Sequence, residues 1–340
     1  MELERFWEDL FSEETLRVRR AWRALSAEEQ SAVRSFLARV STDETRIVEQ
    51  RRAAAVALQV IEDEARYAML PLPEHALHFA RALARQVGLQ LKAALGQAEV
   101  TQKHDGTLLT PYDLRADATL RAAISEAYPD HAVLSEESEH VWRGQEWCWV
   151  IDPIDGTTNF AWGLPTWGVL IALLHRGVPV LGVAEFPLLG EQYSAVRGIG
   201  AWLNGAPIRV LSLSLESPKP EHLFACCTRS LKRGMPDVRA KLRVLGSTAY
   251  NIASVARGAC VGSFDLTVHV WDVAAVWPLI VEAGGFLSTS LPQPLFPLRE
   301  NVDYSGVEFS VLAACSLPMH NWLAARFELP PLASKLPELS

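Results

Sequence analysis

The first 70 residues contain no glycine, and this separates them from the rest of the chain. Ser26 and Glu29 are spaced as a capping box, in which each side chain bonds a free backbone amide of the first helical turn. The apolar residues that follow recur at helical spacing: Val33, Phe36, Leu37 and Val40. The pattern ends at Pro71-Leu72-Pro73. We predict that residues 1–70 form an all-helical extension.

A second long helix is expected after Asp43, because Asp is a preferred residue at helix N-termini. Its apolar stripe would consist of Ile47, Ala54, Val56, Val60 and Ile61. The extension contains no candidate catalytic constellation. It is either a module for dimerisation or partner binding, or a segment that packs on the following domain and adds stability.

After residue 73 the periodicity alternates between that of helices and that of strands. Helices are predicted at 73–95, 114–128, 247–256, 272–283 and 319–327, and strands at 147–151, 166–174, 178–186, 192–196, 206–210, 223–228, 242–245, 264–270 and 307–314. Such interleaved blocks predict an α/β fold of stacked sheet and helix layers over residues 73–328. The Pro-rich residues 329–340 are expected to form a loose tail.

Charge and cysteine usage narrow the classes of function. The net charge of −8 argues against a nucleic-acid partner, since phosphate backbones require concentrated Lys and Arg. The acidic N-terminus lacks the apolar core of a secretory signal, and the apolar run at 169–174 is too short to span a membrane. Five cysteines without CxxC spacing indicate free thiols and a cytoplasmic location.

The sequence from Asp152 to Phe160, DPIDGTTNF, follows directly on a predicted buried strand. Asp152 and Asp155 can turn toward one point if the chain bends at Pro153. Gly156 permits close backbone approach, and Thr157 stands where a helix could begin. Hard oxygen ligands beside a helix N-terminus are typical of a Mg²⁺ and phosphate site. The alternative is an ordinary strand-to-turn segment.

Further acids lie in three other segments. Glu136 is one of a Glu pair after a short apolar strand, and such a pair alone is usually a solvated surface. Asp272 opens a predicted helix, and Asp113 precedes another, so each alone is explained as an N-cap. Their significance depends on whether the fold brings them to Asp152.

Taken together, these segments resemble the inositol monophosphatase superfamily of Mg²⁺-dependent, lithium-sensitive phosphatases. The matching pieces occur in the order that the family has: 103–107 with Asp113, 135–138, 152–160, 271–275 and 282–285. The resemblance covers residues 73–328 and implies a layered αβαβα fold. The chain departs from the family pattern at Ser135, where Gly is usual, at Trp162, where many relatives have His, and at Val276, where Gly is common. Trp162 bears on substrate choice.

The resemblance also implies roles for individual residues. A first Mg²⁺ would be held by Glu136, Asp152 and the carbonyl of Ile154, and a second by Asp152, Asp155 and Asp272. Asp113 would support a third ion with Glu136, or orient Thr157. Substrate-binding positions would be Gly156, Thr157, Gly246, Ser247, Thr248 and Asp265. The implied mechanism is attack on phosphorus by a metal-activated water that Glu136 and Thr157 position.

The expected function is hydrolysis of a small polyol or sugar phosphate such as inositol monophosphate. Residues 165–173 and Pro278 resemble histidinol-phosphate phosphatases, and a fructose-1,6-bisphosphatase activity is a further alternative. A non-catalytic regulator would be expected to lack at least one acidic ligand, and all are present. Since relatives are often dimers, the resemblance implies a homodimer acting on a small phosphorylated metabolite, without nucleic acid or membrane.

Overall fold

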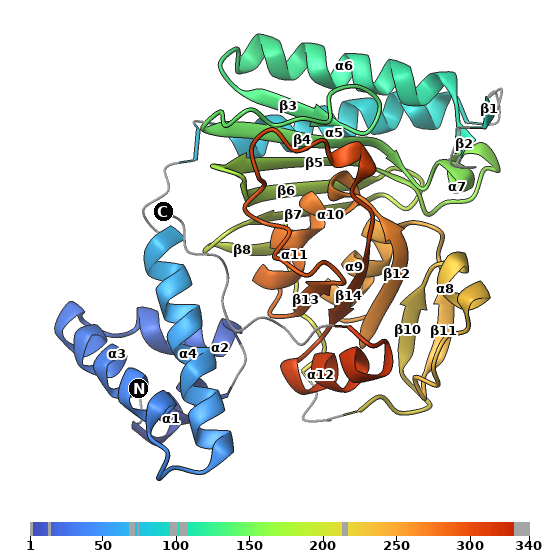
Figure 1. Ribbon diagram of the computed structural model, residues 1–340. Coiled ribbons are helices and arrows are strands. Elements are labelled where there is room, and N and C mark those ends of the chain that lie inside the picture. The colour runs from blue at the N-terminus through green and yellow to red at the C-terminus, as the bar shows by residue number, and fades with distance from the viewer. Residues whose placement is uncertain are drawn as a thin grey trace. The chain divides into compact units, whose positions relative to one another are not determined.

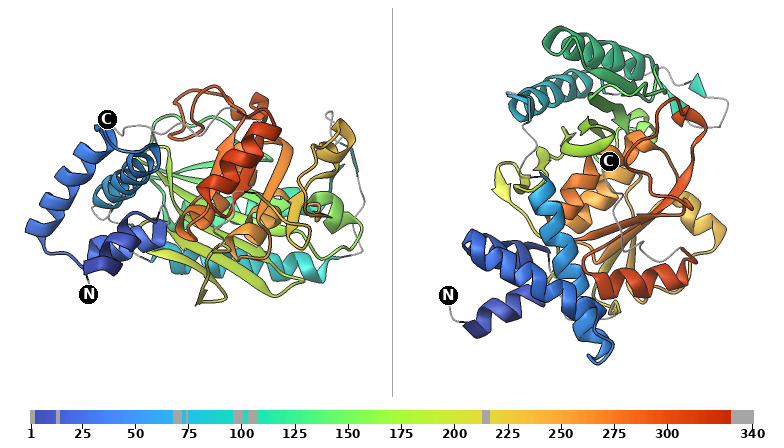
Figure 2. Two further views of the ribbon diagram at one scale, coloured as in Figure 1. Left: turned by 90° about the horizontal axis from the view of Figure 1, so that it is seen from below. Right: turned by 60° about the vertical axis from the view of Figure 1, so that its left-hand side comes forward.

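The computed structural model describes residues 3–12, 15–67, 72–73, 75–95, 101–102, 108–212 and 217–329. The chain divides into two compact units, residues 1–73 and 74–340. Figures 1 and 2 show their secondary structure. Two predictions lie at least partly outside the described residues: the segment 103–107, and the tail, of which only Leu329 is described.

The first unit is helical over its described residues, with α1 (Leu3–Leu10), α2 (Thr15–Arg23), α3 (Ala27–Thr42) and α4 (Val48–Tyr67). The capping box is confirmed, because Ser26 Oγ accepts from Glu29 N at 3.4 Å while Ser26 N donates to the Glu29 carboxylate at 2.7 Å. The helices bury one apolar core, which includes Leu10, Val18, Leu37, Ala54 and Ile61.

The prediction that Asp43 caps the second long helix is wrong. Asp43 ends α3 instead, and its Oδ1 accepts from Thr45 N at 3.0 Å, so the side chain closes a turn before α4 begins at Val48. Ile47 therefore precedes the helix and is 61% exposed, outside the stripe that buries Ala54 and Ile61.

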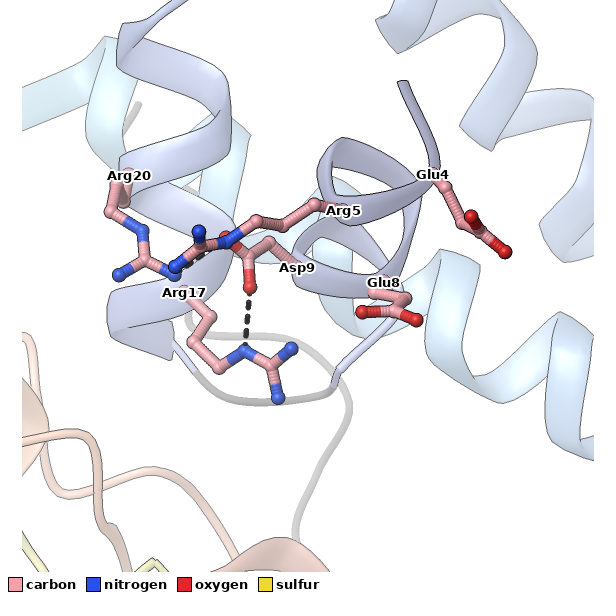
Figure 3. Close-up of a pocket in the computed structure, with 6 residues that line it drawn as sticks. All are labelled: Glu4, Arg5, Glu8, Asp9, Arg17 and Arg20. Carbon is pink, nitrogen blue, oxygen red and sulfur yellow. Dashed lines mark hydrogen bonds and ion pairs between the residues drawn. The ribbon is translucent and has the colours of Figure 1, made fainter. Parts of the chain in front are cut away.

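Six charged residues line a pocket of about 450 Å³ in the first unit, as Figure 3 shows: Glu4, Arg5, Glu8, Asp9, Arg17 and Arg20. Asp9 is buried, and its carboxylate accepts from Arg17 Nε at 2.7 Å and Arg20 Nη2 at 2.5 Å. Burial alone would raise the pKa of Asp9, but the two guanidinium groups hold it below its usual value. These ion pairs join α1 to α2, and the three arginines balance the three acids.

The second unit begins with two helices that cover one face of a seven-stranded sheet. α5 (Ala76–Ala93) packs on the middle strands and α6 (Pro111–Ala127) on β4 (Figure 1). The sheet has the order β3-β4-β5-β6-β7-β8-β9. The strands are β3 (Ala132–Ser135), β4 (Trp147–Asp155), β5 (Gly168–His175), β6 (Val178–Phe186), β7 (Glu191–Val196), β8 (Gly200–Leu203) and β9 (Ala206–Pro207). A short hairpin, β1 (Thr101–Gln102) and β2 (Leu108–Leu109), precedes α6.

A second layer of helices separates this sheet from a five-stranded one. It consists of α9 (Thr248–Ala256), α10 (Val270–Ala274) and α11 (Val276–Glu282). The second sheet has the order β11-β10-β12-β14-β13. Its strands are β10 (Leu223–Cys226), β11 (Lys241–Val244), β12 (Gly262–Val268), β13 (Phe286–Thr289) and β14 (Phe309–Ala314). The short helix α7 (Thr157–Ala161) follows β4, and η1 (Tyr304–Gly306) precedes β14.

Two helices, α8 (Thr228–Arg233) and α12 (Leu317–Arg326), contact the second sheet at β12 and β14 respectively. The order of layers is helix, sheet, helix, sheet, helix, as Figures 1 and 2 show. The predicted layered α/β fold is confirmed. None of the described helices is long and apolar enough to cross a membrane.

The predicted helix at 272–283 is in fact two helices, α10 and α11, which meet at Ala275. Pro278 has no N–H to donate to the carbonyl one turn earlier, so a continuous ladder cannot form there. The break lies against β6: a Cβ on Gly182 would be 1.8 Å from the Ala275 oxygen. Only glycine allows the helix layer to approach the sheet this closely.

Candidate active site

Asp152 and Asp155 lie at the end of β4, at an irregularity in its pairing with β5. The register shifts between these two residues. In a regular strand, residues three apart point to opposite faces, so the shift is what allows both carboxylates to face one point. Both are buried, at 1% and 6% exposure, and Asp152 Oδ1 accepts from Ile154 N at 3.0 Å.

Asp272 reaches the same point from the first turn of α10, where its Oδ2 accepts from His269 N at 2.8 Å. Asp152, Asp155 and Asp272 each offer a carboxylate oxygen, and these oxygens lie within 4.8 Å of one another. Residues that are about 120 positions apart in sequence therefore converge on one small volume.

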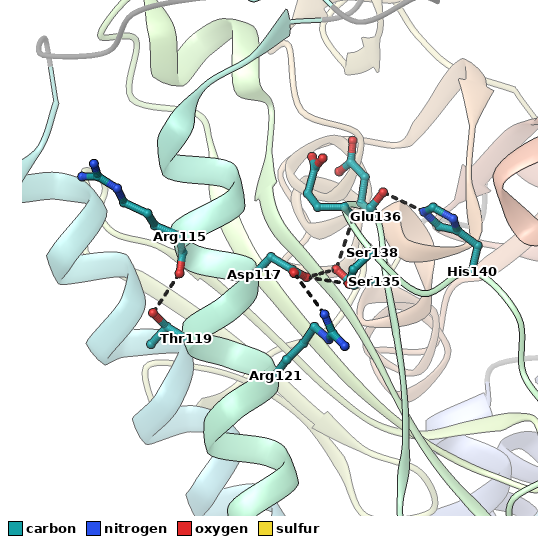
Figure 4. Close-up of polar contacts among 9 residues, drawn as sticks. Arg115, Asp117, Thr119, Arg121, Ser135, Glu136, Ser138 and His140 are labelled. Carbon is teal, nitrogen blue, oxygen red and sulfur yellow. Dashed lines mark hydrogen bonds and ion pairs between the residues drawn. The ribbon is translucent and has the colours of Figure 1, made fainter.

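Glu136 joins this cluster from the loop after β3. Its charge acts on Asp152, Asp155 and Asp272, so its side chain lies beside theirs. The Glu136 carbonyl accepts from His140 Nε2 at 2.9 Å, as Figure 4 shows. The His140 ring lies 5.5 Å from that of Trp271, the residue before Asp272.

Electrostatics show what such a cluster requires. Burial raises the pKa of Asp155 to about 7, although bonds from Ser247 and from the amide of Ala249 oppose the rise. Burial, and then the charge of Glu136, raise the pKa values of Asp152 and Asp272 well above the ordinary value. Like charges at this separation are stabilised either by protonation or by a bound cation. Hard oxygen donors at this spacing fit Mg²⁺.

Thr157 and Asp113 form a second polar unit beside the cluster. Thr157 Oγ1 lies 3.3 Å from Asp113 Oδ1 and 3.1 Å from the carbonyl of Ile154, so its one proton points to an acceptor. Asp113 Oδ2 accepts from Thr110 N and Oγ1, each at 2.7 Å, as part of the cap of α6. The N-cap explanation of Asp113 is wrong in position: Thr110 is the N-cap of α6, and Asp113 is the third helical residue, whose side chain completes a capping box and also contacts Thr157.

The loop before α9 closes the other side of the site. Asn159 Nδ2 donates to the carbonyls of Thr166 at 2.6 Å and Leu245 at 2.7 Å, which fixes this loop against α7. Ser247 Oγ donates to Asp155, and the amides of Thr248 and Ala249 also point to that carboxylate.

Two glycines allow this contact. Gly156 and Gly246 have φ of +86° and +77°, conformations that favour glycine. A Cβ on Gly156 would lie 3.1 Å from the Gly246 carbonyl, and one on Gly246 would lie 2.6 Å from the Asn159 amide. The two backbones therefore meet beside Thr157.

Asp265 lies behind this loop on β12 and is fully buried. Its Oδ1 accepts from Asn251 Nδ2 at 2.8 Å, and burial raises its pKa to about 8. The side chain has no exposed surface to offer a substrate in this structure, so its substrate contact stays a prediction.

The family model of the inositol monophosphatase family matches residues 72–317. The chain belongs to this family. It is 36% identical over 193 residues to a histidinol-phosphatase of Chlorobaculum parvum, covering 55% of this chain and 74% of that protein. It is 36% identical over 199 residues to Nus factor SuhB of Salmonella typhimurium, and this match covers 56% of this chain and 74% of that protein.

Among solved structures, an inositol monophosphatase from Anabaena superposes with a TM-score of 0.59 at 29% identity. The match covers 75% of this chain and 96% of that one. The resemblance that the sequence indicated is confirmed, and family membership supports a phosphatase activity.

The fold brings the predicted metal ligands together and places Gly156, Thr157, Gly246, Ser247 and Thr248 beside them. Sequence reasoning gave no role to Asp117 or Asn251. Asp117 bonds the loop that holds Glu136, and Asn251 bonds Asp265. Asp117 was detectable in principle, because it follows Asp113 by one helical turn and so lies on the same face of α6.

Proposed function

We propose that this protein is a Mg²⁺-dependent phosphomonoesterase that hydrolyses a small polyol or sugar phosphate such as inositol monophosphate. The observation on which this rests is the convergence within 4.8 Å of the carboxylates of Asp152 and Asp155, which are buried, and of Asp272, which is half-buried. Beside them lie the Thr157–Asp113 pair and the loop at Gly246. A phosphate needs cations, a positioned water and backbone amides, and this arrangement offers a place for each.

The residues fit two or three Mg²⁺ ions. Glu136, Asp152 and the Ile154 carbonyl would hold one, Asp152, Asp155 and Asp272 another, and Asp113 with Glu136 a third, looser one. When bound, such ions make water more acidic and stabilise the negative charge of the leaving oxygen. Lithium would be expected to inhibit, as the family resemblance implies.

The chain's own groups then orient the water. Because the Thr157 hydroxyl directs its proton to Asp113 or to the Ile154 carbonyl, its oxygen is left as an acceptor for a water proton. Glu136 would hold the same water from the other side. The amides of Gly156 and Thr157 and the loop at Gly246-Ser247 would hold the phosphate and the alcohol.

A second candidate substrate is an amino-alcohol phosphate such as histidinol phosphate. The histidinol-phosphatase relative favours an amino-alcohol phosphate, and fructose 1,6-bisphosphate is a third. A non-catalytic regulator is a different class of function, and one relative is named a Nus factor. The complete ligand set favours the enzyme, since a protein that had lost catalysis would not need to keep buried carboxylates together.

The remaining proposals concern the whole chain. We infer a helical extension at 1–70 and a phosphatase domain at 73–328 with a tail at 329–340. A homodimer and a cytoplasmic location are also proposed, the latter supported by the five free cysteines. The small phosphorylated metabolite is the expected partner, rather than nucleic acid or a membrane.

The test is phosphate release from inositol 1-phosphate, histidinol phosphate, fructose 1,6-bisphosphate and 3′-phosphoadenosine 5′-phosphate. Each is measured with Mg²⁺, with EDTA, and with Mg²⁺ plus Li⁺, beside Asp152→Asn purified in parallel as the control for contaminating phosphatase. Mg²⁺-dependent release by the wild type, absent in the variant, supports the proposal. If folded protein that binds Mg²⁺ releases no phosphate from any of these substrates, the non-catalytic regulator is favoured.

A further inference from the structure

Asp117 is a buried carboxylate outside the group of predicted ligands. It lies on α6, one helical turn after Asp113, and is 6% exposed. Arg121 Nη1 is 3.8 Å from its Oδ2, but the Arg121 side chain is 44% exposed, so this pair alone does not explain the burial of the acid.

The main contacts of Asp117 are with the loop after β3. Ser135 Oγ donates to its Oδ1, and Ser138 Oγ lies 3.3 Å from the same oxygen. One carboxylate oxygen thus bonds both ends of the four-residue segment that includes Glu136, as Figure 4 shows. Charge-assisted bonds of this kind are stronger than those between neutral groups.

This segment needs such an anchor because of the charges it faces. Glu136 is half-buried beside Asp152 and Asp272, and like charges at this separation repel one another whenever these acids are ionised. Its backbone amide donates to the Ile151 carbonyl at 3.4 Å. Without the two serine bonds, repulsion would favour conformations in which the loop moves Glu136 toward solvent.

The same helix also positions Thr157 through Asp113. Asp113 and Asp117 are spaced by four residues, so both point from one face of α6. A single rigid element therefore sets where the Glu136 loop and the Thr157 hydroxyl lie relative to each other.

We propose that Asp117 is a positioning residue for the metal centre: through Ser135 and Ser138 it holds Glu136 in its ligand position before a cation binds. This inference rests on the proposed Mg²⁺ site. Because the loop is already ordered when the protein folds, less conformational entropy is lost when Mg²⁺ binds. Asp117 therefore contributes to cation affinity.

The experiment is isothermal titration of Mg²⁺ into the full chain and its variants, with thermal unfolding measured in parallel. Asp117→Ala is expected to raise the Mg²⁺ dissociation constant by about tenfold, the range known for partners of metal ligands. Asp117→Asn keeps an acceptor oxygen for both serines and should recover most of the affinity. Thr119→Ala removes a hydrogen bond from the same helix, that of Thr119 Oγ1 to the Arg115 carbonyl, and should leave the constant unchanged.

A double-mutant cycle separates positioning from general stability. If Asp117 acts through the serines, Ser135→Ala combined with Asp117→Ala should weaken Mg²⁺ binding no more than Asp117→Ala does alone. Should Asp117→Ala fail to fold, Ser135→Ala and Ser138→Ala test the same bonds and should each raise the constant severalfold. A lower melting temperature with an unchanged Mg²⁺ constant would overturn the inference.

The two proposals fail in different ways. Wild-type protein that binds Mg²⁺ but releases no phosphate from any substrate would contradict the proposed function, while the binding constants would still decide the role of Asp117. Wild-type protein that does not bind Mg²⁺ would overturn both.

Discussion

Replacing Asp155 by Asn should stabilise the metal-free protein at alkaline pH and weaken its response to Mg²⁺. Burial raises the pKa of Asp155 from 3.8 to about 7, so the folded protein holds this proton more tightly than the unfolded chain does. The stability from that proton is fully present below the unfolded-state pKa and is lost as the pH rises through about 7.

The size of the effect follows from the pKa difference. At about 1.4 kcal/mol per pKa unit, an ionised Asp155 lowers the stability of the metal-free protein at pH 8 by roughly 4 kcal/mol. Asn has no charge to bury, and its carbonyl oxygen can still accept from Ser247 Oγ and Ala249 N. For a domain of this size the gain corresponds to a melting temperature higher by roughly 10 °C.

The assay is thermal unfolding followed by tryptophan fluorescence, with EDTA and with Mg²⁺, at pH 5 and pH 8. The signal reports the second unit, because Trp7 and Trp22 are the only tryptophans before residue 74. In EDTA the variant should melt above the wild type at pH 8, with less than half that difference at pH 5. Mg²⁺ should raise the melting temperature of the variant less than that of the wild type, because the variant loses one ligand of the second proposed ion. Asp130→Asn, at an exposed acid, is the control.

The reasoning is refuted if Asp155→Asn melts below the wild type in EDTA at pH 8. That result would mean that the hydrogen bonds to Asp155, rather than the burial of its charge, dominate its energetics. A Mg²⁺-induced stabilisation equal in variant and wild type would show that Asp155 is not a ligand.

Three further predictions concern the loop at Gly246, the exposed residue Trp162 and the helical extension. Gly246→Ala should lower the unfolding free energy by ~2–3 kcal/mol in urea, since its Cβ would meet the Asn159 amide at 2.6 Å; Gly190→Ala, whose φ is also positive but which has nothing within 4 Å, should lose only about 1 kcal/mol, and equal losses would contradict the steric argument. Trp162→His, at a side chain 77% exposed, should leave the melting temperature unchanged. It should change the kcat/KM ratio between inositol 1-phosphate and histidinol phosphate by about tenfold, so a constant ratio would exclude a role in specificity. Deleting residues 1–70 should keep kcat/KM within about twofold. A much larger loss of activity, or a change in the number of subunits per particle in solution, would assign the extension a functional or dimerising role.

Two of the proposed metal ligands could be predicted because their signals are local. Asp152 and Asp155 follow a strongly apolar strand and precede a glycine, and this combination has few structural explanations. Glu136 and Asp272 were identifiable only through resemblance, since each alone fits a surface pair or an N-cap. The fold class could also be predicted, because long periodic segments indicate clearly whether they form helices or strands. The structure confirms that prediction.

What the sequence could not predict depends on contacts between distant residues. The shift in strand register that turns Asp152 and Asp155 to one side is a property of the β4–β5 pairing. The bond between Asp117 and Ser135 joins α6 to a loop, and Ser135 was noted only as a departure from Gly. Asp43 illustrates a local signal with two meanings. It was predicted to cap a helix, but Asp closes turns as readily as it caps helices, and here it closes a turn.

The division of the ligands between distant parts of the chain has a consequence for synthesis. Glu136, Asp152 and Asp155 leave the ribosome together, whereas Asp272 follows only after the strands β5 to β12. Until then the growing chain holds three acids whose fourth partner has not been synthesised, so the cation binding proposed above would become tight only in the later half of synthesis. Gain of Mg²⁺ affinity would therefore mark the docking of α10 against the first sheet in a nascent chain.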